Sequence, residues 1–99
     1  MDISLQDTLR IRTDVVFRQL DEEAVLLNLK SGTYFGLNDV GARVWQLIAE
    51  QRTLSRVLDA LVEEYDAEPH VLERDLLELS RQLCAKGLVE VNAAGGVIG

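Results

Sequence analysis

The sequence predicts an α+β protein in which a three-stranded antiparallel sheet precedes three helices, a winged-helix-like arrangement with its sheet placed first. Apolar side chains alternate around Val25–Leu29, which is the period of a strand. From Asp39 onward they recur every three or four residues, which is the period of an amphipathic helix. Ninety-nine residues with 47% hydrophobic content suit one small domain with its own core.

The predicted sheet is a meander. Residues 15–20 (VVFRQL) are β-branched and aromatic at their start and predict the first strand, and the acidic residues 21–23 predict the turn that follows. The second strand begins at Val25, and Lys30, Ser31 and Gly32 supply a turn in which glycine can adopt positive φ. The third strand spans residues 33–37. Short connections give the order first, second, third, so the first and third strands are both edges.

Three helices follow, each with a start or stop signal. Asn38 is an N-cap for a helix over residues 39–51, and Thr53 is the N-cap of the next. Pro69 suits the first turn of a helix that runs to residue 86, and Gly87 is suited to the left-handed position that ends it. Gly41 lies one turn into the first helix, where it indicates close packing. The predicted buried stripes are Val40, Val44, Leu47 and Ile48, with Trp45 beside them; Leu54, Val57, Leu58, Leu61, Val62 and Tyr65; and Leu72, Leu76, Leu79 and Leu83.

The ends of the chain have weaker patterns. We expect residues 1–14 to be a partly ordered lead-in, residues 15–91 to be the domain, with a short extended segment over 88–91, and residues 92–99 to be a flexible tail. The N-terminus lacks the apolar region of a signal peptide, and no apolar run could span a bilayer. A single cysteine, Cys84, cannot form an internal disulfide. These features predict a cytoplasmic protein that does not bind membranes.

The formal net charge of −7 restricts the partners. Residues 59–78 contain eight acidic residues and only Arg74 as a base, which predicts either a solvated helix face or an acidic field that attracts a basic peptide or protein surface. A winged helix that reads DNA would need basic or amide side chains at the start of its recognition helix. Here that region contains Glu68, His70, Glu73 and Asp75, which argues against nucleic-acid binding.

Catalytic groups are sparse. His70 is the only histidine, near the start of the third helix, and Cys84 follows the apolar stripe of that helix and is interpreted as a small buried hydrophobe. One histidine and one cysteine do not make a metal-ligand cluster. Glu63 and Glu64 are adjacent and point in different helix directions, so they do not form a carboxylate pair. Gly32 and Gly36 lie within a hairpin and do not open onto a helix as in a phosphate loop. The sequence therefore predicts a binding module and not a catalyst.

Residues 15–91 resemble the PqqD-like family, named for pyrroloquinoline quinone synthesis protein D, which includes precursor-peptide recognition elements. The pattern consists of VLLNLKSGTYFGLNDVGARVWQLI, RTLSRVLDALVEEYDA and LERDLLELSRQLCAKGLVEV. The matching positions are Leu37, Asn38, Gly41, Trp45, Tyr65, Asp66, Asp75, Lys86, Gly87 and Leu88. Each position has a structural role of its own, and their order and spacing over the domain carry the resemblance.

The resemblance implies a peptide chaperone that binds the leader segment of a ribosomally made precursor peptide and presents the precursor to a modifying enzyme. That enzyme would be a radical S-adenosylmethionine enzyme or a leader peptidase. The leader would be held as an added strand beside the third strand, in a cleft closed by the third helix, and no cofactor would be required.

The expected peptide-binding residues lie on two elements. The third strand is an edge, where unpaired N–H and C=O groups can pair with an extended peptide. Gly36 has no side chain to hold off an incoming backbone, and Tyr34 and Phe35 point to opposite faces, so one joins the core and the other can contact the ligand. On the third helix we favour the border that includes Glu78. The expected site residues are Thr33, Tyr34, Phe35, Gly36, Leu37, Val71, Asp75, Leu76, Leu79, Gln82 and Lys86.

Two alternative functions remain at this stage. One is a winged-helix nucleic-acid-binding protein, against which the charge argues. The other is a structural adaptor whose edge strand pairs with another protein or with itself. The expected oligomeric state is a monomer or a weak homodimer.

Overall fold

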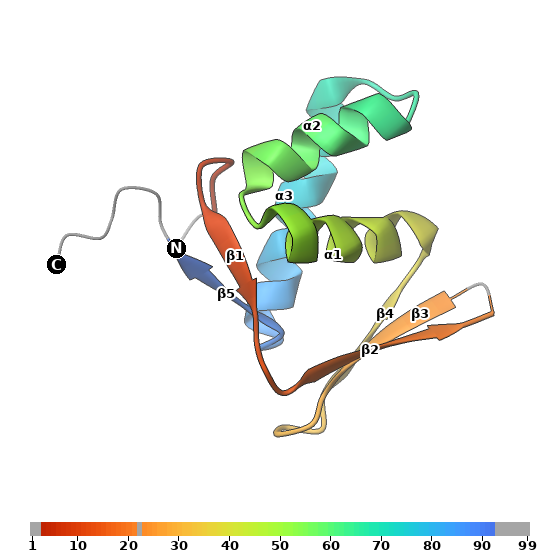
Figure 1. The fold of residues 1–99 in the computed structure, drawn as a ribbon, viewed down its shortest axis with the longest axis vertical. Helices are drawn as coiled ribbons and strands as arrows, with labels where there is room; N and C mark the ends of the chain where they lie inside the picture. Colours follow the sequence, from red (N-terminus) through yellow and green to blue (C-terminus); the bar gives the residue numbers. More distant parts are fainter. Residues whose placement is uncertain (1–2, 22, 93–99) are drawn as a thin grey trace, which may run out of the picture.

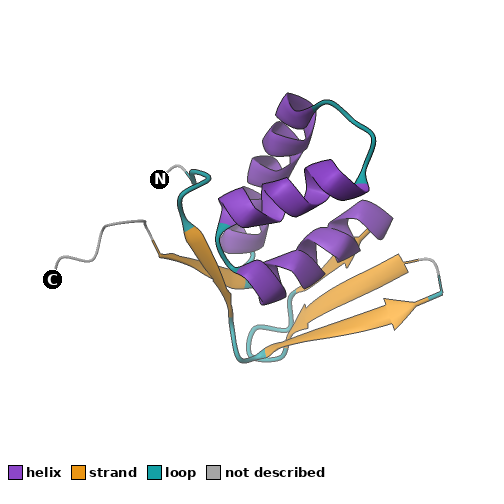
Figure 2. Cartoon of the chain, turned by 45° about the horizontal axis from the view of Figure 1, so that its top comes forward, coloured by secondary structure: helices purple, strands orange, loops and turns teal. Residues whose placement is uncertain are grey.

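The computed structural model describes residues 3–21 and 23–92, and it has strands at both ends of a helical core (Figure 1). The elements in chain order are β1 (Thr8–Ile11), β2 (Val15–Leu20), β3 (Glu23–Asn28), β4 (Tyr34–Leu37), α1 (Asp39–Gln51), α2 (Leu54–Glu64), α3 (Pro69–Ala85) and β5 (Val89–Asn92). The three helices lie together on one side of the β2–β3–β4 sheet (Figure 2). The predicted α+β class and the sequence of sheet before helices are confirmed.

The β2–β3–β4 sheet is the predicted meander, antiparallel throughout and in the order β2-β3-β4. Phe17, Leu26 and Phe35 are cross-strand neighbours on its inner face, where Leu26 is fully buried. Leu27 and Tyr34 are paired on the outer face, and Tyr34 is 71% exposed. β2 and β4 are the two edges, as predicted.

The helix termini follow the predicted signals. The Asn38 side chain accepts a hydrogen bond from the Gly41 N–H at 2.8 Å and caps α1. Thr53 is the N-cap residue of α2, as predicted, although its side chain makes no capping hydrogen bond. Gly87 has φ +73° after α3, and the Leu88 N–H donates to the Leu83 C=O at 2.9 Å, which is the Schellman pattern.

The core is formed by the helices, the inner face of the meander and the β1–β5 ladder. Its fully buried aliphatic side chains are Leu9, Leu26, Leu47, Ile48, Leu54, Val57, Leu61, Leu76, Leu83 and Leu88. Five predicted core positions are less buried than expected. Val40 and Val62 are 41% and 38% exposed, and Leu58, Tyr65 and Leu79 are only partly buried. Ser80, next to Leu79 on α3, is fully buried. The buried face of α3 is thus rotated toward Ser80, and Leu79 lies at its margin.

The segment expected to be a partly ordered lead-in contains β1, which the sequence analysis did not predict. β1 pairs antiparallel with β5, from Thr8 opposite Asn92 to Ile11 opposite Val89. The extended segment predicted after α3 is confirmed as β5, and Asn92, assigned to the tail, is its last residue. Leu9 is completely buried, so β1 contributes directly to the core.

The N-terminal segment is also tied to the connection between α1 and α2. The Leu9 N–H donates to the Arg52 C=O at 2.9 Å, and the Leu54 N–H donates to the Asp7 C=O at 3.0 Å. Arg52 has φ +64° and ψ −45°, and the Thr53 N–H reaches back to the Gln51 C=O at 2.7 Å, the geometry of a strained γ-turn. This turn directs the Arg52 carbonyl at β1.

Some predictions lie outside the described residues. These are the first two residues of the lead-in, Glu22 in the turn between β2 and β3, and residues 93–99 of the expected tail. The boundaries of the domain therefore stay a prediction. Over residues 3–21 and 23–92, no helix has the length and apolar character needed to cross a membrane.

Candidate peptide-binding cleft

The free edge of β4 presents the backbone groups of Tyr34 and Gly36. The Asn28 N–H donates to the Thr33 C=O at 2.8 Å, so this pair is hydrogen-bonded across β3 and β4. In an antiparallel ladder hydrogen-bonded pairs alternate, so Phe35 and Leu37, opposite Leu26 and Ala24, also direct their N–H and C=O groups at β3. The intervening Tyr34 and Gly36 direct theirs away from the sheet.

A cleft of about 480 Å³ borders this edge, and we call it the β4–α3 cleft. One wall is the end of β4, the floor is the first turns of α1, and the other wall is α3. Its lining residues are Phe35, Gly36, Leu37, Asn38, Val40, Gly41, Val44, Leu61, Leu72, Asp75, Leu76, Glu78, Leu79 and Gln82. An open strand edge and a second wall therefore face the same space.

Gly36 and Gly41 shape the β4–α3 cleft in different ways. A Cβ atom added at Gly36 would meet nothing within 4 Å, so the strand edge is unobstructed there. A Cβ atom added at Gly41 would lie 3.2 Å from the Leu37 side chain and 3.3 Å from Asn38 Oδ1. Gly41 thus permits the close packing of α1 on the end of β4 that the sequence indicated.

The α3 wall consists of an apolar row and a polar row. Leu72, Leu76 and Leu79 form the apolar row, and Asp75, Glu78 and Gln82 form the polar row at the same helical spacing. The side chains of Asp75 and Glu78 are 66% and 63% exposed. Arg74 approaches Asp75 at 3.5 Å and Arg81 approaches Glu78 at 3.5 Å, in contacts that are themselves exposed. The α3 rim of the β4–α3 cleft is therefore acidic and solvated.

A second hollow continues from the β4–α3 cleft past the end of β4. Glu23, Gly36, Leu37, Asn38 and Asp39 line it. Glu23 is the first residue of β3, and Asp39 is in the first turn of α1, where the helix dipole favours a negative charge. Acidic side chains thus stand at the α1 end of the β4 edge as well as on α3.

Seven of the eleven predicted site residues line the β4–α3 cleft: Phe35, Gly36, Leu37, Asp75, Leu76, Leu79 and Gln82. Thr33, Tyr34, Val71 and Lys86 do not line it. Tyr34 faces the outer side of the sheet because it alternates with Phe35, while Val71 and Lys86 lie toward the two ends of α3. The border of α3 that contains Asp75 and Gln82 is the one that faces the cleft. The peptide-binding role of these residues stays a prediction.

The contribution of α1 to the β4–α3 cleft was not predicted from the sequence. Val40 was assigned to the core stripe because its spacing to Val44 is helical, but it lies in the first turn of α1, is 41% exposed and lines the cleft. Gly41 offered the available signal, since a glycine one turn into a helix marks close approach of another segment. Leu61 of α2, also a cleft residue, carries no signal that separates it from ordinary core.

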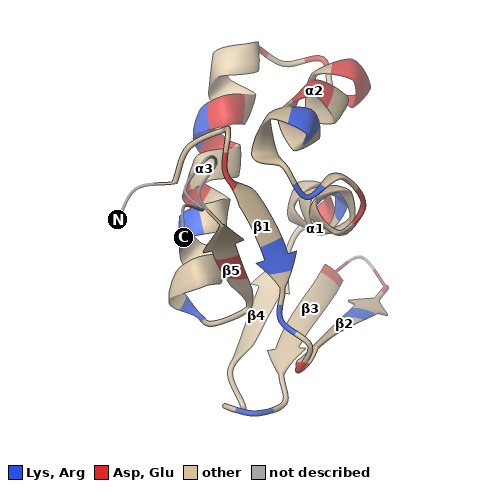
Figure 3. Ribbon diagram, turned by 60° about the vertical axis from the view of Figure 1, so that its left-hand side comes forward, with Lys and Arg blue, Asp and Glu red and all other residues tan. Residues whose placement is uncertain are grey.

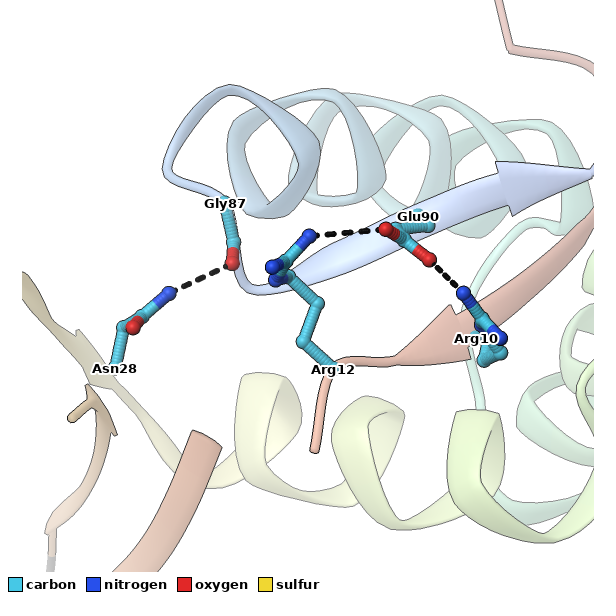
Figure 4. A network of polar contacts seen from close by, with 5 residues as sticks. All are labelled: Arg10, Arg12, Asn28, Gly87 and Glu90. Carbon is cyan, nitrogen blue, oxygen red and sulfur yellow. Dashed lines mark hydrogen bonds and ion pairs between the residues drawn. The ribbon is translucent and has the colours of Figure 1, made fainter. Parts of the chain in front are cut away.

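Asn28 links the β3–β4 hairpin to the end of α3 (Figure 4). Its side chain is buried; Oδ1 accepts from the N–H groups of Lys30 and Ser31, and Nδ2 donates to the Gly87 C=O at 2.9 Å. The carbonyl of Gly87 belongs to the turn that ends α3. This Asn28–Gly87 link holds the base of β4 against the C-terminal end of the opposite wall.

A second polar cluster lies beside the Asn28–Gly87 link on the β1–β5 ladder (Figure 4). Glu90 accepts hydrogen bonds from Arg10 and, at 2.9 Å, from Arg12. The hydrogen bond from Arg10 and its charge lower the pKa of Glu90, and Arg12 adds to this shift. The Arg10 and Glu90 side chains are 68% and 39% exposed, so solvent screens this cluster.

The remaining reactive side chains do not gather in the β4–α3 cleft. His70 is exposed. Cys84, interpreted from the sequence as buried, is only partly buried, and desolvation raises the pKa of its thiol. Glu64 pairs with Arg43 and joins α2 to α1, and that hydrogen bond lowers the pKa of Glu64. The described part of the chain has no group of three or more His, Cys, Asp or Glu side chains that could hold a metal ion.

Two solved structures resemble this fold. One is described as "TbiB1 in Complex with the TbiA(beta) Leader Peptide"; it is 42% identical, with a TM-score of 0.77, over 85% of this chain and 98% of that one. The other is described as "Lasso peptide synthetase B1 complexed with the leader peptide"; it is 31% identical, with a TM-score of 0.75, over 84% of this chain and 98% of that one. No curated protein matches the chain.

The comparison with protein families gives the same result as the motifs. Residues 23–89 match the family described as coenzyme PQQ synthesis protein D (PqqD). The matched segment begins with β3 and ends with the first residue of β5, so it contains both walls of the β4–α3 cleft. This chain therefore belongs to the PqqD family.

Proposed function

We propose that this protein is a non-catalytic recognition element that binds the leader segment of a ribosomally made precursor peptide and presents the precursor to a modifying enzyme. The observation that supports it most directly is the unpaired edge of β4 beside the β4–α3 cleft. The two similar structures are complexes with leader peptides, which supports the same ligand class. The modifying enzyme would be a leader peptidase or a radical S-adenosylmethionine enzyme.

The leader would bind by strand addition. The free N–H and C=O groups of Tyr34 and Gly36 would pair with an extended backbone, which supplies affinity for any sequence in that conformation. Phe35 and Leu37 are on the inner face, so the leader side chains beside them would enter the β4–α3 cleft and meet Leu72, Leu76 and Leu79 of α3. Those pockets would supply selectivity.

The charge of the protein argues against nucleic acid as the ligand. The protein has seventeen acidic residues against ten basic ones, and acidic positions occur on its strands as well as its helices (Figure 3). A phosphate backbone needs a basic surface that releases its counterions. We further propose that the protein works in the cytoplasm, which its single cysteine supports.

Isothermal titration with the leader peptide of the precursor encoded beside this gene tests the proposal, and that peptide is the probe in the tests below. We expect one binding site with a Kd of about 1 µM or tighter, near −8 kcal/mol. In ¹⁵N NMR spectra, the amide signals of Tyr34 and Gly36 should shift the most. Absence of heat together with unchanged spectra would refute leader binding, and salt-dependent binding of duplex DNA would favour the nucleic-acid alternative.

A further inference from the structure

The acidic rim of the β4–α3 cleft specifies the chemistry of its ligand. Among the residues that line the β4–α3 cleft and the second hollow, four are carboxylates, namely Glu23, Asp39, Asp75 and Glu78. None of those lining residues is a lysine, arginine or histidine. The charged side chains that line the space beside the open strand edge are therefore all acidic.

On the basis of the proposed function, we propose that the leader segment bound beside β4 carries a lysine or arginine that faces α3, with its alkyl stem on the apolar row and its charge at Asp75 and Glu78. The geometry suits a long basic side chain. An added strand places alternate side chains level with Phe35 and Leu37, facing Leu72, Leu76 and Leu79. Lysine and arginine bury their stems along such a surface and keep their charges in water.

The existing contacts of the two rim carboxylates do not prevent this. Arg74 is adjacent to Asp75 in sequence, and Arg81 is three residues after Glu78, so both pairs lie along the surface of α3. Both are exposed, and exposed ion pairs contribute little to stability. Asp75 and Glu78 can therefore turn toward a ligand without loss to the fold. An acidic leader residue in the same place would meet two like charges.

The same inference predicts how salt affects binding. The rim charges are solvated, so their attraction for a basic leader side chain is screened when the Debye length falls from about 30 Å at 0.01 M salt to about 8 Å at 0.15 M. The backbone pairing at Tyr34 and Gly36 and the apolar contacts do not depend on salt in this way. Leader affinity should therefore have a salt-sensitive component that belongs to α3.

The test compares two charge-neutralising double variants. Asp75→Asn with Glu78→Gln removes the rim charges, and Asp59→Asn with Glu63→Gln removes two exposed charges of α2 that do not line the cleft. Both change the net charge equally, which separates the local effect from the overall field. Binding of the fluorescein-labelled leader peptide is measured by anisotropy at about 0.01 M and about 0.15 M salt, after circular dichroism has verified folding.

We expect the rim variant to bind about fivefold more weakly at low salt and to lose most of its salt dependence, and the α2 variant to remain within about twofold of the wild type. A leader with its cleft-facing base changed to glutamate should bind poorly to the wild type. An Asp75→Lys, Glu78→Lys variant should restore that binding. Equal binding by the rim variant and the wild type would overturn this inference and leave leader binding intact. A wild-type protein that does not bind the leader would overturn the proposed function itself.

Discussion

β2 and β4 are the two edges of one sheet, yet only β4 has the surroundings of a binding site. On β4, the backbone N–H and C=O groups of Tyr34 and Gly36 point away from β3. By the same alternation, the backbone groups of Val15, Phe17 and Gln19 on β2 also point away from β3, so both edges offer unpaired backbone groups. β4 borders the β4–α3 cleft, whereas β2 ends in exposed Arg18, Gln19 and Leu20. Charged and polar side chains are typical of protected edges. An unpaired edge therefore becomes a specific site when a second wall faces it.

We expect the largest effect on stability and leader affinity from Asn28→Ala, which removes the hydrogen bond between the β3–β4 hairpin and the end of α3. The substitution removes three hydrogen bonds from a buried site and leaves the Gly87 carbonyl without its side-chain partner, so we expect the unfolding free energy to fall by about 2–3 kcal/mol. Leader affinity, measured where the variant is fully folded, should fall about tenfold because α3 is no longer held against the base of β4. Urea denaturation and anisotropy measure the two effects.

Two related variants show whether the Asn28–Gly87 link is responsible. Asn28→Asp keeps the acceptor for Lys30 and Ser31 but loses the donor to Gly87, so it should weaken leader binding as much as alanine does. Ser31→Ala removes two hydrogen bonds with Thr33 within the hairpin and leaves α3 untouched, so its affinity should match the wild type. An Asn28→Ala protein with reduced stability and unchanged affinity would contradict the idea that this link spaces the two walls.

The next effect tests the edges directly with proline. Gly36→Pro removes an outward N–H from β4 without breaking the ladder, and leader affinity should fall about tenfold with little change in stability. Gln19→Pro does the same on β2 and should leave the affinity within about twofold of the wild type. Gly36→Ala retains the N–H, and its added methyl group meets no atom of the protein, so its loss of affinity should be smaller than that of Gly36→Pro. Equal losses at both edges would remove the distinction between β2 and β4.

The elements with local signals were predictable from the sequence, and the strand without one was not. The Asn38 cap and the Gly87 stop specify the start of α1 and the end of α3 through contacts within a few residues. The alternation at Val25–Leu29 predicted β3, although its buried side chains are Ala24, Leu26 and Asn28, and exposed Leu29 lies beyond its end. β1 has no comparable signal, because Thr8–Ile11 becomes a strand only by pairing with β5 about eighty residues later. Long-range pairing of this kind cannot be derived from a local pattern.

The site was predictable on the strand and on α3, but its α1 floor was not. Asp75 and Gln82 follow from the helical periodicity once the border of α3 that faces the cleft is chosen. Strand alternation predicts that the side chains of Tyr34 and Phe35 point to opposite faces of the sheet. Val40 was assigned to the core because its spacing fits the apolar stripe. Its exposure depends on how closely the start of α1 packs on the end of β4 at Gly41, and tertiary packing of this kind cannot be derived from spacing alone.

Val40→Lys, in the α1 floor of the β4–α3 cleft, should have a smaller effect on leader affinity. Val40 is 41% exposed, so the substitution should change the unfolding free energy by less than about 0.5 kcal/mol. It places a positive charge in the β4–α3 cleft and removes apolar contact area, so leader affinity should fall about threefold to fivefold. Val62→Lys is the matched control, since Val62 is 38% exposed on α2 and does not line the cleft. If Val40→Lys and Val62→Lys reduce leader affinity equally, the cause is the net charge of the protein and not a contact between the α1 floor and the leader.

The smallest effect should come from Glu90→Gln on the exposed β1–β5 ladder, because its arginine contacts are screened by solvent. Arg10 lowers the pKa of Glu90 in the folded state, so this carboxylate contributes stability above its unfolded pKa, usually 4.5, and loses it as the pH falls through the folded value. Wild type and variant should therefore differ slightly at pH 7 and converge in acid, as measured by urea denaturation. Leader affinity at pH 7 should not change. If it fell as far as with Asn28→Ala, the wall opposite β4 would depend on the whole β1–β5 ladder and not on one buried amide.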